Sequence, residues 1–334
     1  MSGQKFRWGI SSPGAIAVEF LRSIRTTPSA EVVAVGSRDL GRARAFADTH
    51  GIDTAFGSLE ELAASPDVDG VYVCSPVDAH PAAVRVIASA GKAILIEKPF
   101  AISAEDADAM FATARQHGVF LMEAMWTRFL PAWQQIRALV EGGRIGEVHA
   151  VQASLGYLIL GGTRDDFLLD PSRGGGSLLE VGVYPAQLLQ AFLGTPTRVA
   201  AVSVESPTGV ELSVAAGLTF GDRVGSMQTS LTKSLSNSAT ISGSYGSVHV
   251  PSFFHNARRF DIHTLNGNTE DPYFSVERVE VATELGPLAY QALHVAGRVA
   301  AGETESDVMS PRDTVATLRI LDAIREAARS REGA

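Results

Sequence analysis

The sequence predicts an α/β protein with two domains: a doubly wound parallel sheet, then an α+β domain built on a mostly antiparallel sheet. Two observations predict the first domain: short apolar runs alternate with helical stretches over residues 6–125, and the turns between them are short. A third predicts the second domain, because from residue 148 onward most apolar runs are separated only by turn residues. Since 334 residues exceed one ordinary core, we expect two domains, 1–125 and 126–334.

The expected elements of the first domain alternate strictly between strand and helix. The expected strands are 6–11, 32–37, 54–56, 70–74, 93–96 and 120–122. The expected helices are 14–25, 40–50, 59–64, 79–90 and 103–117. Ser103 and Gly118 bracket the last of these helices with the residue types that begin and end helices. Such alternation is typical of a parallel sheet.

The second domain contains strand-like runs separated by turn material such as Gly221 and Asp222. The expected strands are 148–157, 197–205, 210–220, 224–231, 238–242 and 247–251, and helices are expected at 185–193 and 311–330. The final helix has Ser310 as its N-cap, Pro311 at its first position and Asp313 in its first turn.

Composition excludes several classes of protein. The formal net charge of −9 argues against nucleic acid or an anionic membrane as the main partner. Cys74 is the single cysteine, so no internal disulfide can form and a reducing cytoplasm is the expected location. Residues 1–7 contain no signal-peptide apolar core, and no run reaches transmembrane length. Metal-ligand spacings are missing as well, so we expect no catalytic metal.

The run from Ile94 to Pro99 ends a buried strand in a charged pair, Glu97 and Lys98. In open α/β sheets, ligands bind at the carboxyl ends of the strands. A lysine held there by a rigid X-Pro step is placed to act on a substrate. The alternative is a strand-end salt bridge between Glu97 and Lys98, and the two interpretations are compatible.

The first strand turns into the first helix through a glycine-containing loop, residues 9–17. A dinucleotide-binding loop uses glycine for a tight turn, glycine for close approach of the pyrophosphate, and a small residue for helix packing. Gly14 and Ala17 match the second and third roles, whereas Ser12 replaces the first glycine. An ordinary strand-to-helix turn is the alternative, and the surrounding βαβ pattern favours the nucleotide site.

The end of the second strand indicates which dinucleotide binds. An NAD site places an acidic residue about 20 residues after the loop, to bond the ribose 2′-hydroxyl. Here the strand ends in Ser37 and Arg38, and Arg42 follows one helical turn later. Two guanidinium groups and a hydroxyl can hold a 2′-phosphate through charge-assisted bonds. We therefore expect NADP in preference to NAD, with solvated helix-start arginines as the alternative.

Five motifs, in this order, resemble one family of dehydrogenases. They are the loop at Gly14, Cys74-Ser75-Pro76 with His80, Glu97-Lys98-Pro99, the run from Glu123 to Pro131, and the run from Gly174 to Tyr184. The chain resembles the glucose–fructose oxidoreductase, inositol dehydrogenase and rhizopine-catabolism (Gfo/Idh/MocA) family. Within it, the segment 123–131 is similar to the branch of dimeric dihydrodiol dehydrogenases and NADP-dependent D-xylose dehydrogenases. The resemblance implies a Rossmann domain followed by an open-faced sheet.

The resemblance implies a catalytic pair, Lys98 and Tyr184, with Glu180 nearby. Tyrosine at its ordinary pKa of about 10 is a poor base, but a neighbouring ammonium stabilises the phenolate and lowers that pKa. We expect Tyr184 to accept or donate the substrate's proton and Lys98 to tune it. Many family members carry histidine at the Tyr184 position and an acid, usually aspartate, at that of Glu180. The alternative for Tyr184 is a half-buried tyrosine at a helix start.

The cofactor-binding positions complete the expected site. They are Ser11, Ser12, Pro13, Gly14, Ala15, Ile16, Ser37, Arg38, Arg42, Cys74, Ser75, Pro76, Val77, His80, Glu97, Lys98, Trp126, Arg128 and Tyr290. Trp126 and Tyr290 have packing roles as their alternatives, His80 a local hydrogen bond, and Cys74 on its own indicates inert core. The triple glycine 174–176 is interpreted as letting the chain pass close to the nicotinamide.

The resulting hypothesis is an NADP-dependent oxidoreductase (NAD remains possible) acting on a sugar, polyol or cyclic diol. The alternative is a sensor of the same fold that binds nucleotide and sugar without turnover. Because large apolar patches rarely face water, the open face of the second sheet needs a cover. In the family that face forms a dimer interface, so a homodimer or a dimer of dimers is expected.

Overall fold

The computed structural model describes residues 5–265 and 274–330. The first four residues, part of the segment that the sequence analysis searched for a signal peptide, lie outside the described residues. Contacts divide the chain into two compact units: Met1–Trp126 with Thr283–Thr314, and Thr127–Ala282 with Val315–Ala334. Residues 283–314, which the sequence analysis assigned to the second domain, thus belong to the first unit.

The first unit contains a six-stranded parallel sheet, which confirms the predicted doubly wound architecture. Its strand order is β3-β2-β1-β4-β5-β6. The strands are β1 (Phe6–Ser11), β2 (Ala30–Gly36), β3 (Thr54–Phe56), β4 (Gly70–Val73), β5 (Ala93–Glu97) and β6 (Leu121–Ala124). Dinucleotide-binding sheets have this strand order. Strands β2 and β3 are added on one side of β1, and strands β4 to β6 on the other side. All five residues of β5 are buried, as expected of a parallel strand covered on both faces.

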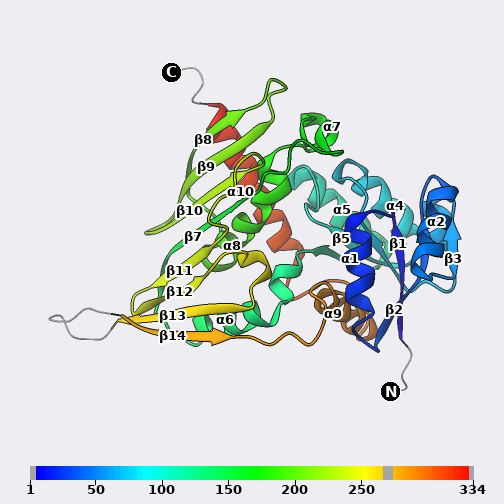
Figure 1. Ribbon diagram of the computed structural model, residues 1–334, viewed down its shortest axis with the longest axis horizontal. Helices are drawn as coiled ribbons and strands as arrows, with labels where there is room; N and C mark the ends of the chain where they lie inside the picture. Colours follow the sequence, from blue (N-terminus) through cyan, green and yellow to red (C-terminus); the bar gives the residue numbers. More distant parts are fainter. Residues whose placement is uncertain (1–4, 266–273, 331–334) are drawn as a thin grey trace. The chain divides into compact units, whose positions relative to one another are not determined.

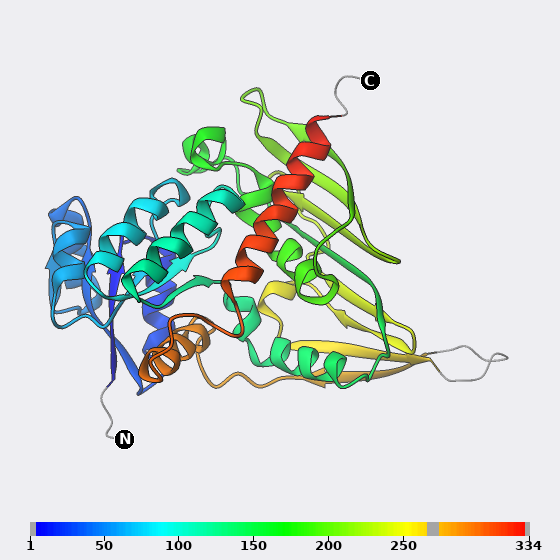
Figure 2. The same cartoon turned by 180° about the vertical axis from the view of Figure 1, so that it is seen from behind.

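Helices cover both faces of this sheet (Figures 1 and 2). They are α1 (Ala15–Ile24), α2 (Leu40–His50), α3 (Leu59–Ala64), α4 (His80–Ser89), α5 (Ala104–His117) and α9 (Ala289–Ala300), with short 3-10 turns at Val77–Ala79 and Trp126–Phe129. Helices α1 and α9 lie on one face, and α4 and α5 on the other. Helix α9, whose N-terminus has no side-chain cap, was not predicted from the sequence.

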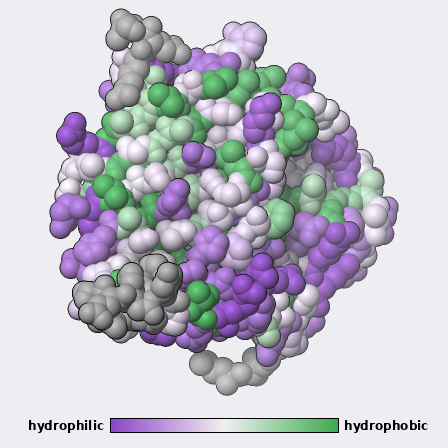
Figure 3. All heavy atoms as spheres, turned by 60° about the vertical axis from the view of Figure 1, so that its left-hand side comes forward, coloured by the Kyte–Doolittle hydropathy of each residue, from purple (hydrophilic) through white to green (hydrophobic). Residues whose placement is uncertain are grey.

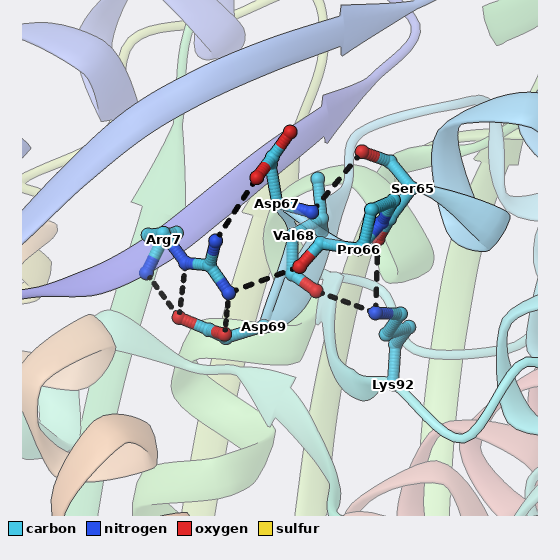
Figure 4. A network of polar contacts seen from close by, with 7 residues as sticks. All are labelled: Arg7, Ser65, Pro66, Asp67, Val68, Asp69 and Lys92. Atoms are coloured by element: carbon cyan, nitrogen blue, oxygen red, sulfur yellow. Dashed lines mark hydrogen bonds and ion pairs between the residues drawn. The ribbon is translucent and has the colours of Figure 1, made fainter.

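A polar network closes the amino ends of β1, β4 and β5, opposite the edge where ligands are expected (Figure 4). The Arg7 guanidinium donates to the Asp69 carboxylate at 2.8 and 3.2 Å and to Asp67 at 3.3 Å. Lys92 Nζ donates to the carbonyls of Ser65 and Val68 at 2.9 and 2.7 Å. The charged residues at this edge therefore have a structural role.

The second unit contains an eight-stranded sheet in the order β14-β13-β12-β11-β7-β10-β9-β8. The strands are β7 (Val148–Gly156), β8 (Arg198–Glu205), β9 (Glu211–Phe220), β10 (Arg223–Ser230), β11 (Ala239–Gly243), β12 (Gly246–Val250), β13 (Arg259–Leu265) and β14 (Phe274–Glu280). Strands β7 and β10 are parallel, whereas the other neighbours are antiparallel. The predicted mostly antiparallel sheet is therefore confirmed.

One face of this sheet is covered by α6 (Pro131–Glu141), α8 (Val183–Leu193) and α10 (Pro311–Arg329), while α7 (Asp165–Leu168) lies in a loop. Within the described residues, the opposite face carries no helix. We did not predict α6, β13 and β14 from the sequence, although Phe260 and Ile262 of β13 alternate with polar residues and are buried. No helix in the described part of the chain is long and apolar enough to cross a membrane.

Candidate active site

The loop between β1 and α1 has the geometry of a dinucleotide-binding turn despite its missing glycine. Ser12 adopts a left-handed backbone with φ +69°, the conformation for which glycine is usual, and its N–H donates to the carbonyl of Gly36 at 2.9 Å. Gly14 is extended, with φ −168°, and a Cβ there would meet no protein atom within 4 Å. Ala17 is fully buried against the sheet. The protein itself therefore does not require glycine at position 14.

Cys74 braces this loop from the end of β4. Its Sγ donates to the carbonyl oxygens of Ser11 and Ser12, at 2.9 and 3.2 Å. Burial, together with the charge of Glu97, raises the pKa of the Cys74 thiol well above its ordinary value. The thiol consequently stays protonated and able to donate. Cys74 is thus a neutral group that holds the nucleotide loop, more than the inert core residue that its type alone indicates.

The end of β2 presents two exposed arginines, Arg38 and Arg42. The Arg42 guanidinium donates to the carbonyl of Pro13 at 3.1 Å, which brings it to the nucleotide loop. Asp39, the one acid between the arginines, is the N-cap of α2 and accepts from the N–H groups of Gly41 and Arg42 at 2.8 and 3.2 Å. Its carboxylate is occupied by the helix, so the cationic groups dominate this strand end.

His80 is buried and ties two loops together. Its Nδ1 lies 3.0 Å from the carbonyl oxygen of Phe100, and its Nε2 lies 2.9 Å from that of Ser75. Burial lowers the pKa of His80, and the two carbonyl contacts oppose that shift. A neutral ring has one N–H and can donate to only one of these oxygens. These two contacts accordingly support the local-bonding interpretation of His80.

At the carboxyl end of β5, Glu97 is buried and accepts a hydrogen bond at each of its carboxylate oxygens. One comes from the hydroxyl of Tyr72, and the other from the backbone N–H of Lys98 at 3.1 Å. The peptide bond between Lys98 and Pro99 is cis. Trp126 begins a 3-10 turn two residues after the end of β6. Lys98 and the nucleotide loop therefore belong to the same strand-end edge of this sheet.

Tyr290 lies in α9, outside the alternating part of the chain. Its hydroxyl accepts from the backbone N–H of Leu285 at 3.3 Å. The residue is partly exposed, and this contact is local to the start of the helix. A role of Tyr290 in cofactor binding stays a prediction.

In the second unit, Tyr184 and Glu180 sit where a π-helical turn, Leu178–Gly182, leads into α8. Such π turns are rare and occur frequently at functional sites. The Glu180 carboxylate forms a bidentate ion pair with Arg164, with N···O distances of 2.9 and 3.0 Å. Arg164 comes from the loop that follows β7. The ion pair thus connects that loop to the turn before Tyr184.

Aromatic side chains surround the Tyr184 ring. The ring of His255 lies 5.2 Å from it, centroid to centroid. Tyr157 stacks on Phe253 at 6.4 Å, and its hydroxyl lies 3.4 Å from His255 Nε2. Burial, with a smaller contribution from the charge of Tyr184, raises the pKa of Tyr157 to about 12. Within this cluster, Tyr184 is positioned by the start of α8. Tyr157 stays protonated because its pKa is raised.

Arg128, expected near the nicotinamide, contacts α8. Its guanidinium donates to the side-chain oxygens of Gln187 and Gln190 at 2.9 and 2.6 Å, and to the carbonyl of Gln187 at 3.3 Å. These bonds connect the 3-10 turn at residues 126–129 to the helix that carries Tyr184. Arg128 is thus a group that orients α8.

The triple glycine is explained by packing within the chain. A Cβ at Gly175 would lie 2.5 Å from the carbonyl oxygen of Leu168, and one at Gly176 would lie 2.8 Å from the carboxylate of Glu211. Gly176 also has φ +113°, a conformation that other residues rarely adopt. These two glycines are required by the chain's own backbone and by a buried acid, whether or not a cofactor lies near them.

Four residues of the site were not identified individually from the sequence: Tyr72, Tyr157, Arg164 and His255. Tyr72 had one available signal, a hydroxyl inside an otherwise apolar buried strand. The other three lie in loops after β7 and β12, where no periodic pattern or spacing relates them to Tyr184. Only the folded second unit brings these segments together.

The fold and these sites define an oxidoreductase with a dinucleotide-binding Rossmann domain, and comparison with known proteins names its family. A family model for oxidoreductases with an NAD-binding Rossmann fold matches residues 6–125, and one for the GFO/IDH/MocA C-terminal domain matches residues 133–249. The chain belongs to the GFO/IDH/MocA family, as its motifs predicted. It is an NAD(P)-dependent dehydrogenase or reductase.

Its relatives fall in the branch that the sequence indicated. The chain is similar to trans-1,2-dihydrobenzene-1,2-diol dehydrogenase of Sus scrofa, with 35% identity over 326 residues, 96% of each chain. It is 39% identical to the Homo sapiens enzyme of that name over 249 residues, 73% of this chain and 74% of the relative. Among solved structures it is similar to KijD10, a 3-ketoreductase from Actinomadura kijaniata in complex with NADP and TDP-benzene. The TM-score is 0.83 at 26% identity, covering 97% and 98% of the two chains.

Proposed function

We propose that this protein is an NADP-dependent oxidoreductase that acts on a CH–OH or C=O group of a sugar, polyol or cyclic diol. The observation that carries the proposal is Lys98 at the carboxyl end of β5, supported by a buried carboxylate, in a sheet whose Gly14 loop leaves room for a ligand. The first unit would bind the cofactor, and the second would bind the substrate and form the dimer.

The residues present fit a dinucleotide. Gly14 has no protein neighbour that would oppose a side chain, so the space it leaves is available to the pyrophosphate. The N–H groups of Ala15 and Ile16 open α1, and a helix N-terminus binds phosphate favourably. KijD10, at 26% identity, binds NADP. NADP, when bound, supplies or accepts a hydride at nicotinamide C4.

The preference for NADP rests on the end of β2. Arg38 and Arg42 are exposed, and the carboxylate of Asp39 is engaged as a helix cap. A free carboxylate would bond the ribose 2′-hydroxyl of NAD and repel a 2′-phosphate, whereas guanidinium groups and the Ser37 hydroxyl attract it. NADPH should accordingly bind more tightly than NADH.

Proton transfer is assigned to Tyr184, with Lys98 beside the same substrate oxygen. Tyr184 accepts the hydroxyl proton during oxidation and returns it during reduction. The Lys98 ammonium stabilises the phenolate and orients the oxygen. Glu180 supports the substrate side of the site from the preceding turn, where Arg164 holds its carboxylate.

The test is to compare Tyr184→Phe and Lys98→Ala with the unaltered protein. Each substitution should abolish turnover while NADPH still binds, measured by fluorescence titration. A panel of aldoses, diols and keto-sugars, followed by NADPH absorbance, identifies the substrate. Full activity in both variants would contradict the mechanism. Binding of NADPH without turnover on any member of the panel would favour the sensor alternative.

The open face of the eight-stranded sheet supports a homodimer, or a dimer of dimers. Val202, Val204 and Val224 are 58%, 63% and 53% exposed on this face. Beside them, small and amide side chains line a shallow hollow of about 350 Å³. On the side shown in Figure 3, hydrophobic residues intermingle with hydrophilic ones and with residues of intermediate hydropathy. Light scattering at micromolar concentration should give at least a dimer. We place the protein in the cytoplasm because its single cysteine is a thiol.

A further inference from the structure

Tyr72 carries a hydroxyl into the middle of the first unit's core. The residue is fully buried in β4, between Val71 and Val73, which are buried as well. Its hydroxyl donates to one oxygen of the Glu97 carboxylate. A buried carboxylate without hydrogen-bond donors would be costly, so this contact stabilises the charged form of Glu97.

The sheet register explains why this tyrosine reaches this acid. Tyr72 lies opposite Leu95 in the parallel pair of β4 and β5. Glu97 follows Leu95 by two residues, which places it on the same face about 6.6 Å farther along the strand. That distance matches the reach of a phenol ring. Phe20 of α1 stacks on the Tyr72 ring at 3.9 Å and 14°, so the ring has little freedom to turn away.

The second oxygen of Glu97 leads to the catalytic lysine. It accepts the backbone N–H of Lys98 at 3.1 Å. Two donors, the buried hydroxyl of Tyr72 in β4 and the half-buried backbone N–H of Lys98 at the strand end, thus hold one carboxylate between them. This chain of contacts links Phe20, Tyr72 and Glu97 to the backbone from which the Lys98 side chain begins.

We propose that Tyr72 is a positioning residue for the reaction: through Glu97 it fixes the backbone at Lys98 and so the direction from which the Lys98 amine reaches the substrate oxygen. Tyr72 itself contacts neither substrate nor cofactor. The inference rests on the proposed role of Lys98. It extends the strand-end site inward to a core residue of the neighbouring strand.

The experiment is a double-mutant cycle of Tyr72→Phe and Glu97→Gln in the full chain. Tyr72→Phe removes only the hydroxyl and keeps the ring that stacks on Phe20. We expect kcat to fall about tenfold, a loss that corresponds to one misplaced hydrogen bond, while the Kd for NADPH stays the same. Because both residues act through one carboxylate, the double variant should lose no more activity than Glu97→Gln alone.

Tyr245→Phe is the matched control, since it removes a phenol hydroxyl that is exposed in the second unit, and it should leave kcat unchanged. An unchanged kcat in Tyr72→Phe would overturn the inference, and so would additive losses in the cycle or weakened NADPH binding. If Tyr72→Phe does not fold, Glu97→Gln decides alone: lost kcat with intact NADPH binding supports positioning, and unchanged kcat refutes it.

Lys98→Ala separates this inference from the proposed function. If Lys98→Ala remains active, the assignment of Lys98 fails, and the role of Tyr72 fails with it. If Lys98→Ala is inactive while Tyr72→Phe and Glu97→Gln are fully active, only the positioning inference is wrong.

Discussion

The two units build their parts of the site in different ways. In the first, the nucleotide loop follows β1, and Arg38, Cys74 and Lys98 lie within two residues of the ends of β2, β4 and β5. In the second, Tyr184 begins a helix, but its neighbours Tyr157 and His255 come from loops about 27 residues before and 71 residues after it. A parallel sheet gathers ligand-binding groups at one edge by its topology, whereas an antiparallel unit gathers them by long-range packing.

The largest expected effect tests the first kind of site. Replacing Arg38 and Arg42 by alanine together should weaken NADPH binding at least about 100-fold, because two charge-assisted bonds to a phosphate, at roughly 1.5–3 kcal/mol each, together contribute about 3 kcal/mol or more. NADH binding should be unchanged. Fluorescence titration of both nucleotides measures the difference. Arg44→Ala is the control, because Arg44 is an exposed arginine in α2, the helix that carries Arg42. It should change neither the NADPH nor the NADH affinity.

Two glycine substitutions sharpen the comparison between a ligand-facing and a packed backbone. Gly176→Ala should lower the free energy of unfolding by about 1–3 kcal/mol, since φ is +113° and the new Cβ meets the Glu211 carboxylate. Gly14→Ala should leave stability unchanged, because the new Cβ meets no protein atom. It should weaken NADPH binding, because the Cβ occupies the space proposed for the pyrophosphate. Urea unfolding and nucleotide titration separate the two effects. Equal destabilisation by both would remove the distinction.

The fold was largely predictable because each element has a local cause. The strand at Phe6–Ser11 and the helix at Leu40–His50 have their predicted bounds, since apolar runs and the Asp39 and Gly51 caps define them. Helix α9 was not predictable, because its N-cap residue, Leu288, gives no capping signal. Its assignment to the first unit depends on contacts such as that between Ser23 and the backbone of Leu288, 265 residues away in sequence.

The same distinction between local causes and long-range contacts holds for the site. Ser12 could be identified as the residue in the position of the first glycine, and the structure gives it the left-handed backbone that this position requires. The partner of Glu180 could not be identified, because nothing near Arg164 in the sequence distinguishes it from an ordinary surface arginine. Residue types report local backbone demands, whereas ion pairs between loops depend on how the whole unit folds.

Tyr157→Phe tests whether the aromatic neighbours of Tyr184 share its chemistry. Burial raises the pKa of Tyr157 to about 12, so its hydroxyl gives up a proton less readily than an ordinary tyrosine and is a poorer base. We expect kcat to fall no more than about threefold, the size of one weak hydrogen bond. The pH profile of kcat should be unchanged. Complete loss of activity, matching that of Tyr184→Phe, would move the proton-transfer role to Tyr157.

The smallest effect concerns the outer strands of the second unit, which the sequence analysis missed. Asp261 of β13 lies opposite Arg278 of β14, and the pair is joined by hydrogen bonds of 2.9 and 3.4 Å. The hydrogen bond and charge of Arg278 lower the pKa of Asp261 below its ordinary value. Arg278 is 60% exposed, so solvent screening limits the pair's contribution to about 0.2–1 kcal/mol.

The sign of its pH dependence follows from that lowered pKa. The folded state holds the carboxylate charged more readily than the unfolded state, so the pair stabilises the protein above the unfolded pKa of about 3.9. This contribution is lost as the pH falls through the folded pKa. Asp261→Asn should therefore reduce the free energy of unfolding at pH 7 and make progressively less difference below pH 4, measured by urea unfolding. Asp222→Asn, in the turn between β9 and β10, is the control. A difference between wild type and Asp261→Asn that did not shrink on acidification would mean that the substitution acts through strand packing and not through charge.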